Sequence, residues 1–318
     1  MYLKKLLKIF VFVAFFCVTA LADDALLANA NFKITVFYPD VRKPYSDFFK
    51  TIISGIKEQS NQSIHLQIID KSTNESDIFE SLQQNKPDVV ILLGGNFKPL
   101  QDKIAASYNT IHGATFFNNK DALNGRVGIS MDPEPAQLFT ELIKIHPAIK
   151  KIHVVFEANS NGWLIQRAAQ AAKNKGLILV SHEASSTQQA ALIYRELARN
   201  NNHSENALWL LHHDPTLDTK SLLPRILADA WKYKQVVISS NPSHVRRGAL
   251  LSLLPDNQKI GQDLALVANN MLNGQKINIE PMRTSLVVAN IRTAKHLSGT
   301  IRLQQKNNFA LTYPRKNN

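Results

Sequence analysis

The sequence contains a single cysteine, Cys17, among 318 residues. One thiol can form neither an internal disulfide nor a multi-cysteine zinc site, so the hydrophobic core must stabilise the fold. Glycine and proline are sparse, at 12 and 13 residues, which excludes collagen-like and low-complexity chains. Apolar residues nevertheless make up 44% of the chain, and its length suits two domains, each with a core of its own.

The chain also lacks the short motifs of common hydrolases and phosphate-binding proteins. No Gly-x-Ser-x-Gly, His-Glu-x-x-His or Gly-x-x-x-x-Gly-Lys pattern occurs. Single serine, histidine and aspartate residues are plentiful, but a catalytic triad is a spatial arrangement that a sequence does not show. We therefore expect no enzymatic activity, no metal and no cofactor.

Acidic residues are outnumbered, with 25 Asp and Glu against 37 Lys and Arg, which gives a formal charge of +12. Such an excess can indicate a nucleic-acid partner. Here, however, the basic residues form small scattered groups without interleaved aromatic residues; examples are Arg42-Lys43, Lys150-Lys151 and Arg246-Arg247. The pattern favours a solvated basic surface and no nucleic-acid partner.

The N-terminus has the three parts of a secretory signal peptide. A lysine-containing start is followed by the uncharged, mostly apolar segment 9–22, which ends in the small-x-small sequence closing at Ala22. This segment is shorter than the ~20 apolar residues that span a bilayer. We therefore expect a signal peptide at 1–22, cleavage after Ala22 and a periplasmic location, although an uncleaved anchor is the alternative. Cleavage would also remove Cys17, which suits an oxidising compartment.

The rest of the chain alternates between short apolar runs and amphipathic segments. The run 88–93 is almost entirely apolar, as expected for a strand buried on both faces of a parallel sheet. Expected strands are 33–38, 64–69, 88–93, 110–116, 151–156, 177–182, 207–211, 235–239 and 285–289, and 126–131 is a bridging segment between the two halves. Expected helices are 46–58, 75–84, 98–106, 134–146, 161–175, 187–199, 218–232 and 257–273. This rhythm occurs twice, with about four strands each time, and predicts an α/β fold of two doubly wound parallel-sheet lobes.

The stretch from about Val127 to Thr300 resembles the ABC-transporter substrate-binding proteins of the type I, two-lobed periplasmic class. The resembling subfamily includes members associated with aromatic amino acids. The patterns that carry the resemblance are VGISMDPEPAQLFTELIKIHPAIKKIHVVFEANSN, AAQAAKNKGLILV, RRGALLSLLPDNQKIGQDLALVANNMLNGQK and VVANIRTAKHLSGTI. The chain departs from the family pattern at 256–259, where a tyrosine-rich helix start is usual, and at 157–160, where Asn-Pro is usual.

The resemblance implies two lobes that the chain crosses between three times, near 128–132, 241–246 and 281–285. The N-lobe would comprise 31–127 plus 246–280, and the C-lobe 128–245 plus 281–300. The segment 306–318 has few apolar residues, and we expect a flexible tail there.

The resemblance also implies a function. A small solute would bind between the lobes, the lobes would close by a hinge motion, and an ABC permease in the inner membrane would recognise the closed form. The alternative is a sensory role, in which the closed form contacts a membrane receptor. We expect a monomer in either case, and the charged and planar groups considered below suggest an amino acid or a similar zwitterion.

Ligands of doubly wound domains bind at the carboxyl ends of the strands, so the residues that follow the expected strands are the candidates. In the N-lobe, Gly94-Gly95-Asn96 permits close backbone approach to a ligand, although a simple tight turn is the alternative. Phe116 could supply an aromatic wall, and the loop from Asp40 to Ser46, which includes Tyr45, has a suitable polar and aromatic composition.

In the C-lobe, three groups follow expected strands. The helix-start amides around Ser160 and Asn161 could bind a carboxylate, and Trp163 could stack on a planar group, although a cap and a surface tryptophan are the alternatives. Asp214, after two histidines, could bind an ammonium group or start the next helix. Adjacent strand residues point to opposite faces, so the two histidines are not expected to share a metal. Asn241, at the second crossing, completes the candidate set.

Overall fold

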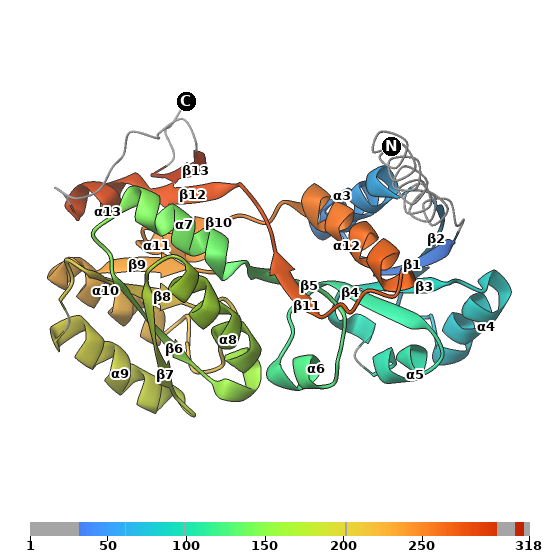
Figure 1. Ribbon diagram of the computed structural model, residues 1–318, viewed down its shortest axis with the longest axis horizontal. Helices are drawn as coiled ribbons and strands as arrows, with labels where there is room; N and C mark the ends of the chain where they lie inside the picture. The colour runs from blue at the N-terminus through green and yellow to red at the C-terminus, as the bar shows by residue number, and fades with distance from the viewer. Residues whose placement is uncertain (1–31, 61, 98, 201, 298–308, 315–318) are drawn as a thin grey trace, which may run out of the picture.

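The computed structural model describes residues 32–314, apart from 61, 98, 201 and 298–308. The expected signal peptide at 1–22 lies outside the described residues. Figure 1 shows two lobes side by side, each built on a twisted sheet with helices on both faces. This arrangement confirms the predicted fold class. Within the described residues, no helix is both long enough and apolar enough to span a bilayer.

The first lobe contains a six-stranded sheet in the order β11-β5-β4-β3-β1-β2, and all its pairs are parallel. Its strands are β1 (Lys33–Pro39), β2 (Ser63–Ile69), β3 (Val89–Leu93), β4 (Asn109–Thr115), β5 (Gly128–Pro133) and β11 (Ile279–Met282). Its helices are α3 (Tyr45–Gln59), α4 (Glu75–Asn85), η2 (Gly95–Phe97), α5 (Gln101–Ala105), α6 (Asn119–Leu123) and α12 (Asn257–Leu272). The amphipathic α3 and α12 pack on one face, and α4 and α5 cover the other.

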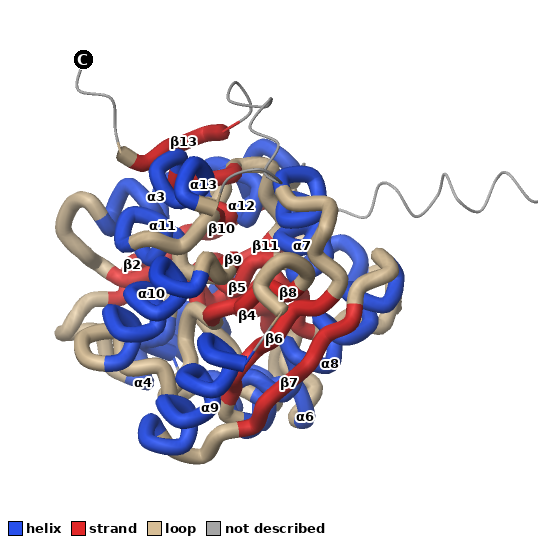
Figure 2. The backbone as a smooth tube through the Cα atoms, turned by 90° about the vertical axis from the view of Figure 1, so that its left-hand side faces the viewer, coloured by secondary structure: helices blue, strands red, loops and turns tan. Residues whose placement is uncertain are grey.

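The second lobe contains a seven-stranded sheet in the order β13-β12-β10-β9-β8-β6-β7. Its strands are β6 (Lys151–Phe156), β7 (Ile178–Glu183), β8 (Asn206–Leu210), β9 (Val236–Ser239), β10 (Leu251–Leu253), β12 (Val287–Asn290) and β13 (Phe309–Tyr313). Its helices are α7 (Pro135–Ile145), α8 (Ala158–Asn174), α9 (Thr187–Asn200), α10 (Leu222–Tyr233), α11 (Pro242–Arg247) and α13 (Ile291–His296). Figure 2 shows α9 and α10 on one side of this sheet and α7 and α8 on the other.

The chain crosses between the lobes three times, at Glu134, 254–256 and 283–286. Backbone hydrogen bonds connect these segments: Glu134 N donates to Met282 O at 2.9 Å, and Leu254 N donates to Leu286 O at 2.7 Å. The third crossing agrees with the sequence expectation, but the first two are displaced. The segment 128–133 pairs with β4 and β11 and so belongs to the first lobe. The segment expected to cross at 241–246 forms α11 in the second lobe, and β10 follows it there.

The prediction of a flexible tail at 306–318 is wrong for residues 309–313. These residues form β13, which pairs in parallel with β12 at the edge of the second sheet. The reason lies in their alternation, because Phe309 and Leu311 pack against core clusters of the lobe. The estimate of about four strands per lobe was also too low, because short strands such as β10, with three residues, leave little periodicity in the sequence.

Candidate functional site

The loops that follow the strands of the two sheets meet around one aromatic side chain, Phe116. It follows β4 in the first lobe and contacts two histidines that follow β8 in the second. The ring of His212 lies edge-on to Phe116 with the ring centroids 4.6 Å apart. The ring of His213 stacks on Phe116 at 5.4 Å, with 16° between the ring planes. The carboxyl ends of β4 and β8 therefore face each other across the junction of the lobes.

Three of the predicted N-lobe residues come together beside this contact. Gly94, Gly95 and Phe116 line one small pocket together with His112; it has about 10 Å³, room for roughly one water molecule. Gly94 has a φ of 93°, which favours glycine, and its amide donates to Gly113 O at 2.9 Å. Gly94 therefore forms a tight turn, and the same turn brings the backbone close to the junction. Asn96 lies in η2, directly after this turn.

The loop from Asp40 to Ser46 does not line that pocket, although Pro39, which directly precedes the loop, lies beside Gly94. Asp40 is exposed, and its amide donates to Ile69 O at 2.8 Å. Tyr45, which is 69% exposed, begins α3, and Ser46 lies in the first turn instead of capping it. Asp40 and Tyr45 are thus exposed and Ser46 is partly buried, and a role for them in ligand binding stays a prediction.

Asp214 has a different environment from the one that the sequence suggested. Its side chain is buried, and each carboxylate oxygen accepts two hydrogen bonds from the protein. Oδ2 accepts from Glu157 N at 2.8 Å and Asn161 Nδ2 at 2.9 Å, and Oδ1 accepts from the amide and hydroxyl of Thr216. The geometry does not support a role in ammonium binding, because all of the acceptor positions of the carboxylate are used to join two loops.

The start of α8 is likewise occupied by the protein itself. Glu157 caps the helix: its carboxylate accepts from Asn159 N at 3.1 Å and from Ser160 N at 2.8 Å. A ligand carboxylate at these amides would have to displace it. Asn161 is buried and donates to Asp214 and His213 O, so it also holds the loops together. Sequence reasoning missed Glu157; the signal that could have identified it is an acidic residue directly between a strand and a helix.

Trp163 is part of the core instead of an exposed wall. It is buried among residues of the second lobe, and its indole N–H donates to Phe117 O at 3.2 Å. Since Phe117 directly follows Phe116 in the first-lobe segment after β4, this hydrogen bond joins the lobes beside the candidate site. The side chain of Phe117 packs in the same cluster. Trp163 therefore helps to position Phe116 without a free ring face of its own in the candidate site.

Beside the junction, two buried imidazole nitrogens have no hydrogen-bond partner among the described residues: Nδ1 of His212 and Nε2 of His244. His244 lies on α11, which Asn241 caps by accepting from Ser243 N, and its Nδ1 lies 2.9 Å from Ser239 Oγ. Burial lowers the pKa of His212 to about 4, with a further contribution from His213. Burial also lowers the pKa of His244 to about 4, assisted by His212. Both imidazoles are thus neutral at pH 7, and each can donate or accept a hydrogen bond.

The connection between the lobes carries a group of ion pairs. Arg167 of α8 contacts Glu134 at the first crossing at 2.6 Å and Glu280 of β11 at 3.0 Å. Arg283, in the third crossing, also contacts Glu280 at 3.0 Å. Glu134 is buried and Arg167 only partly exposed, so the pairing is screened less than a surface pair would be. The group connects the second lobe to both of the strands that lead into the hinge.

Asp132, at the end of β5, gives this hinge region a pH-sensitive group. Its Oδ2 accepts from Ser130 Oγ at 2.8 Å, but Oδ1 is buried with no partner. Burial raises the pKa of Asp132 to about 6, and the Ser130 hydrogen bond only partly offsets this effect. Between pH 4 and 6 the folded protein therefore keeps a proton that the unfolded chain has released, so this group lowers stability as the pH rises.

We expect Asp132→Asn to be more stable than the wild type at pH 7, and equally stable near pH 4. A shift of about two pKa units corresponds to a difference of about 3 kcal/mol. Urea unfolding of both proteins from pH 4 to 7 measures it. The buried histidines give the free energy of unfolding the opposite pH dependence. They contribute equally in both proteins, so their effect cancels in the comparison. A constant difference across this range would show that Asp132 is ionised in the folded state.

Within the described residues, no group of three or more His, Cys, Asp or Glu side chains is arranged to hold a metal ion. The model of one protein family, ABC transporter substrate binding protein, matches residues 54–305. Among proteins of curated function, none matches this chain in sequence.

Solved structures share the fold at low sequence identity. A protein from Streptococcus pneumoniae described as an ABC domain in complex with L-Trp is 17% identical, with a TM-score of 0.50 over 89% of this chain and 100% of that one. A ligand-free, open substrate-binding protein with adhesive properties from Clostridium difficile is 16% identical, with a TM-score of 0.56 over 88% and 98%. A chain of the XylFII–LytSN complex is 14% identical, with a TM-score of 0.51 over 80% and 96%.

The two-lobed architecture and the three crossings agree with a family match that spans more than half of the sequence. This chain belongs to the ABC transporter substrate-binding protein family.

Proposed function

We propose that the protein is exported to the periplasm, binds a small solute between its lobes and delivers it to an ABC permease of the inner membrane. One observation carries the proposal: the ends of strands from both lobes meet at Phe116, His212 and His213, and three chain segments connect the lobes. Three crossings permit a hinge motion, and a ligand held by both lobes would favour the closed form. We place the export signal at 1–22 with cleavage after Ala22.

The ligand that this junction suits is a zwitterion with a planar group, such as an aromatic amino acid. Phe116 and His213 stack face to face from opposite lobes, so a planar group could enter between them when the lobes separate slightly. Polar groups of the ligand could bond to His212 Nδ1 and His244 Nε2, which have no partner. The L-Trp complex of the Streptococcus pneumoniae relative supports this ligand class.

The experiment is a ligand screen by thermal shift, followed by calorimetry and small-angle scattering. L-Trp, L-Tyr and L-Phe should raise the melting temperature, because a ligand bound only to the folded state stabilises it. The same ligands should reduce the radius of gyration if binding closes the lobes. Stabilisation by sugars instead would contradict the ligand class, and an unchanged radius at saturation would contradict cleft closure.

Replacing Phe116 by alanine should weaken binding of the best ligand from that screen by about tenfold. The reason is the loss of an aromatic contact worth on the order of 1–1.5 kcal/mol. Leu192→Ala is the control, because Leu192 is an apolar side chain on α9 that is 52% exposed and lies away from the junction. Calorimetric titration decides the matter: equal affinities of Phe116→Ala and the wild type would place the ligand elsewhere.

The sensory alternative shares the fold, the junction and the ligand, and it differs only in the membrane partner. The structural similarity to a chain of the XylFII–LytSN complex keeps this alternative open without favouring it. Genes for a permease and an ATPase beside the gene for this protein would support transport. Stimulation of the permease's ATPase activity by the ligand-bound protein in reconstituted vesicles would establish it.

A further inference from the structure

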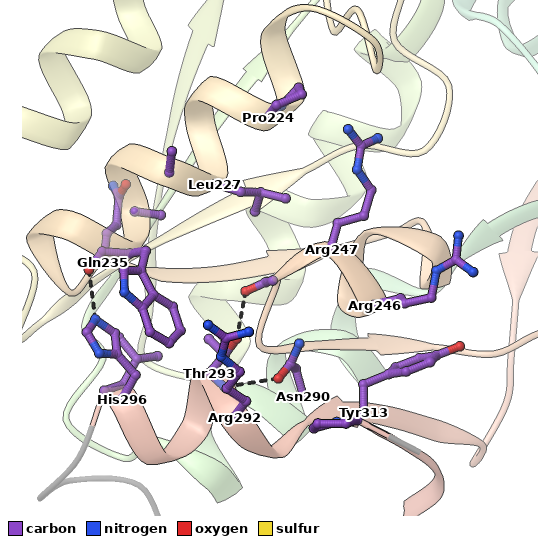
Figure 3. A pocket seen from close by; sticks show the side chains of 16 residues that line it. Pro224, Leu227, Gln235, Arg246, Arg247, Asn290, Arg292, Thr293, His296 and Tyr313 are labelled. Carbon is purple, nitrogen blue, oxygen red and sulfur yellow. Dashed lines mark hydrogen bonds between the residues drawn. The ribbon is translucent and has the colours of Figure 1, made fainter. Parts of the chain in front are cut away.

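A second pocket, of about 690 Å³, lies at the far end of the second lobe from the junction. Its walls come from α10, α11, α13 and the end of β13 (Figure 3). Gln235, which precedes β9, lines this pocket, whereas Asn241 and the junction histidines follow the carboxyl ends of β9 and β8. The length of β9 therefore separates Gln235 from the junction, and α11 carries His244 beside the junction and Arg246 and Arg247 in this pocket.

The pocket is positively charged. Three arginines line it, Arg246, Arg247 and Arg292, and no aspartate or glutamate does. Among the described residues, none of the three has a carboxylate partner within salt-bridge distance. Arg247 donates only to a backbone oxygen, that of Thr219, at 2.8 Å. Unneutralised guanidinium groups in a concave site attract anions, and their planar N–H array suits carboxylate and phosphate oxygens.

The same pocket offers aromatic surface. Trp231 is 38% exposed, which is unusual for so large a ring, and it lines the pocket with Tyr313. Trp231 stacks with His296 at a centroid distance of 3.7 Å and 5° between the planes, and the Arg292 guanidinium lies 5.1 Å from its ring. Figure 3 shows His296 and Arg292 side by side on α13, which forms one wall of the pocket. Because Trp231 stays exposed with both neighbours in place, part of its surface is open to a further flat ring.

One buried polar group in the lining lacks a partner. Gln235 is 3% exposed, and its Nε2 donates no hydrogen bond. An unpaired buried donor costs free energy that an acceptor on a ligand would recover. Charge, aromatic surface and an unused donor thus occur in one concave region.

We propose that this pocket binds a small organic anion with a flat ring, of the nucleoside monophosphate type, independently of the solute in the junction. The guanidinium groups would bind the anionic part, and the ring would pack on the Trp231 wall. The proposal does not depend on which solute the junction binds. A molecule that has only the anionic group or only the flat ring should bind more weakly, because it contacts only part of the pocket.

The test is a titration of the purified protein with adenosine 5′-monophosphate, followed by tryptophan fluorescence and calorimetry. Trp163 and Trp209 are buried, so quenching would report mainly on Trp231. Adenosine and inorganic phosphate serve as the two partial probes, and each should bind at least tenfold more weakly. Arg292→Ala should weaken binding of the monophosphate about tenfold or more. Arg225→Ala is the matched control, because Arg225 is an exposed arginine of α10 outside this pocket.

Unchanged binding by Arg225→Ala and by Phe116→Ala, together with the loss in Arg292→Ala, would support the proposal. Three results would overturn it: no binding of the monophosphate, equal binding by Arg292→Ala and the wild type, or loss of binding in Phe116→Ala, which would place the ligand in the junction. Phosphate binding as tight as that of the monophosphate would overturn the aromatic part of the assignment. Arg292 is exposed, so circular dichroism should show an intact fold in its variant.

Discussion

Replacing Asp214 by alanine should lower the free energy of unfolding by about 3 kcal/mol, because the change leaves several buried donors unsatisfied. The carboxylate accepts four hydrogen bonds, and two of them come from Glu157 N and the side chain of Asn161, at the start of α8. Chemical denaturation of the wild type and the variant measures the loss. The effect falls on stability and on the arrangement of the junction together, since His213 directly precedes this residue.

Asp218 provides the matched control in the same connection. Its carboxylate accepts from the amides of Lys220 and Ser221 but is only partly buried, so Asp218→Ala should cost much less stability than Asp214→Ala. Equal losses in the two variants would show that burial of Asp214 does not matter. A stable Asp214→Ala protein that no longer binds ligand would restore the ammonium-binding role that the sequence suggested.

Gly261→Ala should destabilise the first lobe by about 3 kcal/mol or prevent its folding. An alanine Cβ at this position of α12 would lie 2.0 Å from Ile52 O and 2.8 Å from Ile56 N of α3. Backbone atoms cannot move aside as a side chain can, so the two helices would have to separate. Gly55 of α3 makes the reciprocal close approach, with its Cβ position 2.1 Å from Gln258 O. The measurement is thermal unfolding of the variant.

The loss of stability expected for Gly261→Ala is opposite to the usual effect of this substitution in a helix. Glycine to alanine inside a helix ordinarily stabilises a protein by about 0.5–1 kcal/mol. Gly162→Ala in α8 is the control, because the new Cβ would approach only the side chain of Asn119, at 3.2 Å, which can rotate. We expect that variant to differ little from the wild type. A stabilised Gly261→Ala protein would mean that α3 and α12 are not in close contact.

Elements with strong patterns were predictable from the sequence because their burial is simple. The strand at 88–93 is buried throughout, and the helix at 257–273 turns a continuous apolar face to α3. The boundaries of the lobes were harder to predict, because they depend on which strands pair with one another. Nothing in the sequence of 128–133 reveals that it continues the first sheet beside β11, which lies some 150 residues later. Short elements such as α11 and β10 contain too few residues to show a period.

The sequence indicated which loops would approach one another, but not which of their polar groups are already occupied. Gly94, Gly95 and Phe116, which follow expected strands, do line one pocket, whereas their role in binding a ligand stays a prediction. The roles suggested for Asp214 and for the amides around Ser160 could not be judged from the sequence, because it does not show which protein groups already form hydrogen bonds with them. Glu157 competes for those amides, and Asn161 binds Asp214 from 53 positions away in the chain. The sequence did not indicate that His212 and His213 contact Phe116; only the structure shows these contacts.

The discontinuous first lobe has a consequence for folding during synthesis. Its sheet gains the edge strand β11, and α3 gains its partner α12, only after residues 257–282, which follow most of the second lobe in the chain. Until those residues have been synthesised, the apolar face of α3, with Ile52 and Ile56, has no cover from α12. A chain that emerges N-terminus first from the ribosome therefore stays incompletely folded for most of its synthesis, which exposes it to proteases and to aggregation.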